Sequence, residues 1–131
     1  MASPLVIFLH RGEYDSVHQA LSIAAAATAT GRPVELYFFW WALERFVRGN
    51  LDVPDLERDD VNATMELRGV PTIRQLLDSV RDSGSAKIFA CTGSIASLGL
   101  TPPDVEPKVD ALIGWTAILQ RTSGVVDRFQ F

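Results

Sequence analysis

The sequence contains a single cysteine, Cys91, among its 131 residues, so no disulfide can form within the chain. No second cysteine and no histidine stands at metal-ligand spacing from Cys91, and we therefore expect no zinc site. This cysteine usage favours a reducing compartment and predicts a cytoplasmic protein. The chain also lacks an apolar run long enough to span a bilayer, and no secretory signal is recognisable, so we expect no membrane association.

Basic patches and glycine-rich phosphate motifs are lacking as well. The net charge is −4, and no cluster of lysine or arginine predicts a nucleic-acid partner. Without a G-x-G-x-x-G segment, a phosphate-binding Gly-Lys loop or a serine-nucleophile elbow, the sequence predicts neither nucleotide nor esterase chemistry, and no cofactor. The acidic segment 50–70 carries Asp55, Asp59 and Asp60, but it lacks the glycine of a calcium loop. We interpret it as a solvated surface excursion and predict no metal site.

What the chain does contain is a set of apolar runs separated by helical patterns. Apolar residues make up 47% of the sequence, and residues 1–131 are expected to form one domain. A continuous apolar run predicts a buried strand at Leu5–Leu9, and further segments predict strands at Val34–Trp40, Lys87–Ala90, Val109–Ile113 and Val125–Phe129. Helices are expected at 14–30, 41–47, 71–83, briefly from Ser94, and at 115–122, with a short helical piece inside 50–70. This alternation predicts an α/β fold, a three-layer α/β/α sandwich around a mostly parallel five-stranded sheet. The first three strands are expected to be neighbouring and parallel, with helices on both faces.

Two helix starts carry the spacing of a capping box. Ser16 and Gln19 have this spacing near the start of the first expected helix, and Thr72 and Gln75 have it at the start of the third. In both pairs the hydroxyl and the amide side chain are expected to satisfy backbone N–H groups that have no partner within the helix.

Candidate functional residues follow the expected strands, because sites in parallel sheets form beyond the carboxyl ends of the strands. These candidates are His10, Arg11, Trp41, Cys91, Thr92, Gly93 and Ser94. Cys91 is either a buried packing residue or a reactive thiol. Because a following helix start stabilises a thiolate and Ser94 can cap that helix or donate to the sulfur, we predict an accessible, reactive thiol. His10 and Arg11 follow the first strand, which we expect to be central and to lie beside the cysteine strand. Either Arg11 stabilises a thiolate or binds an anion and His10 moves a proton, or His10 caps the strand and Arg11 is solvated. Trp41 either borders an apolar ligand pocket or packs in the core or in an interface.

Several segments together resemble the DsrE/DsrF-like family. Cys91-Thr92-Gly93-Ser94, with Gly99 five residues after the serine, is similar to the C-x-x-S-x-x-x-x-G segment of that family. The likeness continues in Gln19-Ala20-Leu21 and in Gly114-Trp115-Thr116. A phenylalanine-rich second strand and a proline-led helix before the cysteine strand add to it. The resemblance therefore covers nearly the whole chain apart from the acidic excursion.

The resemblance implies a sulfur-relay role in which Cys91 carries sulfur as a persulfide between a donor and an acceptor protein. It also implies self-assembly into trimers or hexamers, with Phe38-Phe39-Trp40-Trp41 reaching an interface. Thr92-Gly93 stands where many relatives carry a bulkier pair, which alters the expected pocket. The alternative is a non-enzymatic module of the same fold that binds a small ligand or partner, with Cys91 only lining the cleft. A purely structural oligomer subunit is a third interpretation.

Overall fold

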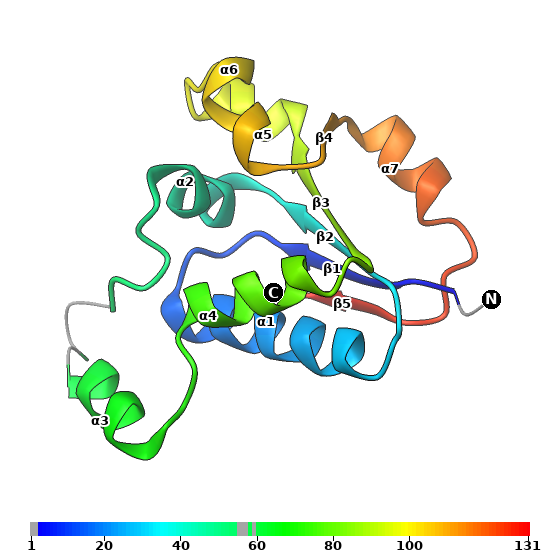
Figure 1. Cartoon of the computed structure of the whole chain (residues 1–131). Coiled ribbons are helices and arrows are strands. Elements are labelled where there is room, and N and C mark those ends of the chain that lie inside the picture. The colour runs from blue at the N-terminus through cyan, green and yellow to red at the C-terminus, as the bar shows by residue number, and fades with distance from the viewer. Residues whose placement is uncertain (1–2, 55–57, 59) are drawn as a thin grey trace.

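The computed structural model describes residues 3–54, 58 and 60–131, which form an open sheet flanked by helices (Figure 1). In chain order the elements are β1 (Leu5–Leu9), α1 (Tyr14–Ala29), β2 (Val34–Phe38), α2 (Trp40–Arg48), α3 (Asp60–Arg68), α4 (Ile73–Asp82), β3 (Ala86–Cys91), α5 (Thr92–Ser97), α6 (Pro102–Val105), the 3₁₀ turn η1 (Glu106–Lys108), β4 (Ala111–Ile113), α7 (Trp115–Arg121) and β5 (Arg128–Gln130). Within this described part of the chain, no helix combines the length and apolar composition that crossing a membrane requires.

The five strands form one sheet in the order β4-β3-β2-β1-β5, and every neighbouring pair is parallel. The predicted α/β fold is therefore confirmed, with a sheet that is entirely parallel. The expected neighbours β1, β2 and β3 are adjacent, with Leu5 opposite Val34 and Val34 opposite Ala86. All residues of β1 and β2 are buried because both faces of these strands are covered, which explains the continuous apolar run of β1.

The strand order places the helices unequally on the two faces of the sheet. Strands β1, β2, β3 and β4 follow one another in one direction across the sheet. The chain then crosses back over the sheet, and β5 pairs with the other side of β1. Because crossovers between parallel strands are right-handed, the return places α7 on the face opposite α1 and α4. Figure 1 shows α1 and α4 together on one side and α7 on the other. We call these the α1 face and the α7 face.

Each face has its own apolar core. On the α1 face, small residues of α1 such as Ala20 and Ala24 let the helix pack closely on the sheet and on the stripe of α4, which contains Ile73 and Val80. The core of the α7 face is smaller and more aromatic. Its buried members are Val6, Phe8, Tyr37, Phe39, Phe89, Cys91 and Ile118.

One of the two predicted capping boxes is confirmed and the other is wrong. At the start of α4, the Gln75 N–H donates to Thr72 Oγ1 at 3.1 Å, and the Thr72 N–H donates to Gln75 Oε1 at 2.9 Å. Helix α1 instead begins after Glu13, whose side chain makes no capping bond. Ser16 therefore lies inside the first turn, where its N–H donates to Asp15 Oδ1 at 2.8 Å.

The last two strands are shorter than predicted. β5 begins only at Arg128, because the Val125 N–H donates to the Thr122 carbonyl in a turn and Val126 is exposed. β4 begins at Ala111, after η1. In the segment 50–70, the expected helical piece is α3, which has no buried residues. Asp55 and Asp59 lie outside the described residues.

Candidate functional site

The carboxyl edge of the sheet gathers the candidate residues, because parallel strands all end at the same edge. His10 and Arg11 follow β1, Phe39 and Trp40 follow β2, and Cys91 is the last residue of β3. The direction of strand connection reverses between β1 and β5, so the topological switch point lies beside His10 rather than beside Cys91.

Cys91 belongs to the strand and not to the turn. β3 extends one residue beyond the predicted Ala90, and Cys91 pairs with Ile113 of β4. Side chains alternate along a strand, so Cys91 points to the α7 face together with Phe89, while Ala90 points to the α1 face. The Cys91 side chain is only 3% exposed. The expectation of an accessible thiol is therefore wrong for this conformation of the chain.

Of the residues that follow Cys91, Gly93 lies close to its sulfur. Thr92 and Gly93 are exposed, and Ser94 is buried. A Cβ atom placed on Gly93 would lie 3.8 Å from Cys91 Sγ, so any side chain at this position would touch the sulfur. A Cβ atom on Gly114 would lie 3.3 Å from Thr92 Oγ1, closer than ordinary van der Waals contact. The lack of a side chain at Gly93 and Gly114 lets the carboxyl ends of β3 and β4 lie close together.

Ser94 does not have the predicted capping role. The N-cap of α5 is Cys91 itself, and no side chain caps this helix end. α5 has only six residues, so few aligned peptide dipoles stabilise charge at its start.

Two aromatic rings stack on Phe39, which lies beside Cys91. Phe39 directly follows Phe38, the partner of Ala90, so Phe39 lies next to Cys91 at the edge of the sheet. The Trp115 ring stacks on Phe39 with 4.9 Å between centroids and 16° between planes. The His10 ring also stacks on Phe39, with 4.4 Å between centroids and 13° between planes. Burial lowers the pKa of His10 below its ordinary 6.5, because the imidazolium loses hydration there, and this favours the neutral ring.

We expected His10 and Arg11 to lie beside β3, the strand that carries Cys91. This expectation is wrong. β2 separates β1 from β3, and the Phe39 ring lies beside both His10 and Cys91. Arg11 is exposed, and its backbone N–H donates to the Phe131 backbone oxygen at 3.3 Å. His10 and Arg11 instead border an open cavity of about 460 Å³ at the switch point, together with Ser16, Gln130 and Phe131.

Trp40 and Trp41 project from the end of β2 toward the surface. Their side chains are 43% and 56% exposed, and their rings are 5.4 Å apart. Trp40 has a φ of 44°, a left-handed backbone that costs about 1–3 kcal/mol in a residue other than glycine. A Cβ atom at Gly12 would lie 3.0 Å from the Trp41 carbonyl oxygen, so Gly12 permits this close approach. Trp41 does not line the cavity that His10 and Arg11 border.

A buried ionic cluster on the α7 face was not predicted from the sequence. Glu35 of β2 is buried and accepts hydrogen bonds from Arg121 Nη2 at 2.7 Å, from Arg121 Nε at 3.0 and 3.1 Å, and from the Tyr37 hydroxyl at 2.7 Å. Burial and this bond to Glu35 raise the pKa of Tyr37 well above its ordinary value. The bond to Glu35 also raises the pKa of Arg121. A single carboxylate inside an apolar strand was the available clue, because such a group requires a partner.

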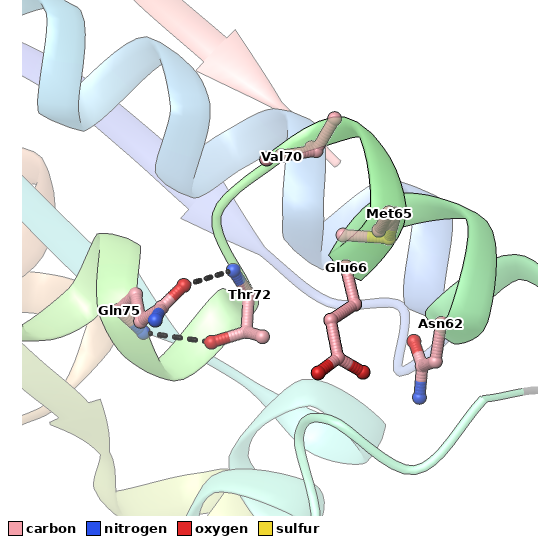
Figure 2. Close-up of a pocket in the computed structure, with 7 residues that line it drawn as sticks. Asn62, Met65, Glu66, Val70, Thr72 and Gln75 are labelled. Atoms are coloured by element: carbon pink, nitrogen blue, oxygen red, sulfur yellow. Dashed lines mark hydrogen bonds between the residues drawn. The ribbon is translucent and has the colours of Figure 1, made fainter.

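A second cavity, of about 440 Å³, lies between α3 and α4 (Figure 2). Asn62, Met65 and Glu66 of α3 border it, and so does the Thr72–Gln75 capping box, whose reciprocal bonds Figure 2 shows as dashed lines. Its lining includes one carboxylate and no cationic side chain. It contains none of the residues that follow the strands, and we assign it no chemistry.

The sequence matches no protein-family model, and no curated protein matches it. Within residues 3–54, 58 and 60–131, no three His, Cys, Asp or Glu side chains are grouped to hold a metal ion.

Proposed function

We propose that this protein is a DsrE-like sulfur carrier in which Cys91 holds sulfane sulfur as a persulfide. The observation that supports this best is the position of Cys91 at the carboxyl end of β3, where Gly93 places no side chain of its own against the sulfur. The resemblance of Cys91-Thr92-Gly93-Ser94 to the family segment points to the same residue. Protein donors and acceptors of sulfur are the partners that this function implies.

The transfer moves sulfur without net oxidation or reduction. Cys91 first gives its proton to water, and the thiolate attacks the outer sulfur of a donor persulfide, R–S–SH. A new bond joins Cys91 Sγ to that sulfur, while the donor S–S bond breaks and its electron pair leaves on the donor thiolate, which takes up a proton. An acceptor thiolate then attacks the outer sulfur on Cys91, and Cys91 leaves as a thiolate.

The test is intact-protein mass spectrometry after the native chain is exposed to cysteine persulfide. We expect a mass increase of one sulfur atom in the wild type, reversed by a thiol acceptor, and none in Cys91→Ser. Serine is the matched control because it retains the size and loses the sulfur. The proposal fails if the adduct forms only after denaturation, since Cys91 is then a packing residue.

A second candidate function is a partner-binding module that assembles with copies of itself, as trimers or hexamers. The observation that favours it is the exposure of three tryptophans, Trp40, Trp41 and Trp115, at the carboxyl edge of the sheet. Large apolar side chains gathered on a surface favour a protein interface. Light scattering at micromolar concentration tests it, with an oligomer expected for the wild type and a smaller mass for Trp41→Ala. A monomer mass for the wild type contradicts it.

A further inference from the structure

The α7 face of the sheet is covered by one short helix. Among the buried members of its core, Ile118 is the single residue of α7, and the others come from strands or their ends. Elsewhere on this helix, Trp115 is 44% exposed and Leu119 is 62% exposed. By contrast, α1 buries six of its residues against the opposite face. α7 therefore has a small apolar contact with the sheet.

At its first residue, α7 is held by an aromatic stack that crosses the cysteine strand. Ile113 of β4 pairs with Cys91 of β3, and Trp115 follows Ile113 by two residues. The Trp115 ring nevertheless stacks on Phe39, at the end of β2. Because β3 lies between β4 and β2, the indole ring crosses the end of β3, where Cys91 lies on the same face.

At its last residue, α7 is held by the ionic cluster. The Arg121 guanidinium makes its hydrogen bonds to Glu35 at 2.7–3.1 Å and lies 4.8 Å from the Phe89 ring centroid. The Arg121 side chain is still 38% exposed, so water can replace Glu35 as its partner. Beyond the helix, Gly124 has a φ of 77°, with no atom within 4 Å of a Cβ placed there.

We propose that α7 is a hinged cover that opens as a unit, without global unfolding, and that this opening exposes Cys91. Its contacts are concentrated at Trp115 and Arg121, with Ile118 between them, and such segments open at a lower free energy than the whole domain. Opening of α7 would give sulfur donors and acceptors access to Cys91, as the sulfur-carrier function requires. The biological role of the opening rests on that proposed function, but the opening itself does not.

Thiol labelling of the native protein tests the cover, because Cys91 is the chain's only thiol. We would add excess maleimide at increasing urea concentrations and follow adduct formation by mass. If α7 opens locally, labelling at low urea should be at least about tenfold faster than global unfolding predicts, and nearly independent of urea. Labelling that equals the rate calculated from global unfolding at every urea concentration overturns the proposal.

Two variants and their matched controls locate the contacts that hold the cover. Arg121→Gln should speed native labelling by about tenfold, equivalent to about 1.4 kcal/mol, beyond any change in global stability. Arg48→Gln, which alters an exposed arginine on α2, should leave the rate unchanged. Trp115→Ala should also speed labelling, whereas Leu67→Ala, which alters an exposed apolar residue of α3, should not. Equal rates in the variants and their controls, after correction for global stability, overturn the proposal.

The two proposals fail in different ways. If native labelling shows local opening but no persulfide forms on Cys91, the α7 cover stands and the sulfur-carrier function is wrong. If persulfide forms on the native protein while Arg121→Gln and Trp115→Ala leave labelling unchanged, the function stands and the cover is wrong.

Discussion

The buried carboxylate of Glu35 permits a quantitative prediction about stability. Its side chain is 11% exposed and accepts four hydrogen bonds from Arg121 and Tyr37. Glu35→Gln retains the shape but removes the charge, and leaves the guanidinium without its anion. Removing one partner of a fully buried pair costs about 3–5 kcal/mol. The Arg121 side chain is 38% exposed, so water can hydrate its guanidinium once the carboxylate is removed. We therefore expect Glu35→Gln to lower the free energy of unfolding by less than this, about 2 kcal/mol, which is typical of hydrogen bonds to a charged group.

Urea unfolding followed by circular dichroism measures this cost. We expect a lower midpoint with an unchanged slope, because the same surface is exposed on unfolding. Glu44→Gln is the matched control, since its pair with Arg48 is 3.5 Å long and exposed, and it should cost less than about 0.5 kcal/mol. Equal losses in the two variants would refute the reasoning, because burial of Glu35 would then add nothing to the value of its bonds.

Two further predictions concern pH and a helix start. The folded-state pKa of His10 is lowered by burial, so the unfolded chain binds its proton more readily, and stability should fall as pH decreases below about 6.5. His10→Phe, which retains a ring on Phe39, should make urea midpoints between about pH 5.5 and 7.5 flatter, and an unchanged slope contradicts this. Thr72→Ala removes the hydroxyl acceptor of the α4 capping box and should cost about 1 kcal/mol in urea unfolding, while a cost near zero would show that water replaces it.

The strands that form the centre of the sheet could be predicted because their signal is local. The apolar run Leu5–Leu9 coincides with β1 residue for residue, and Thr72 and Gln75 form the predicted capping box. In both cases the residues that decide the structure are adjacent in sequence. The fold class followed from the alternation of such runs with helical patterns.

The candidate site could be predicted only in part, because it depends on contacts between distant segments. The sequence located Cys91 at the end of a strand, but a difference of one residue in the length of β3 turned its side chain into the α7 face. The separation of His10 from Cys91 depends on strand order, which no local pattern specifies. The bond between Glu35 and Arg121 joins residues 86 positions apart, and Trp115 reaches Phe39 across another strand.

The position of β5 has a consequence for how the chain folds during synthesis. β1 pairs with β2 on one side and with β5, near the end of this sequence, on the other. At about 5–20 residues per second, roughly ten seconds separate the synthesis of β1 from that of Arg128–Gln130. During this interval the backbone N–H and C=O groups on one side of an entirely apolar strand have no partner. An unpaired apolar edge promotes association between chains. Until β5 is synthesised, the edge of β1 is therefore open to pairing with other nascent chains.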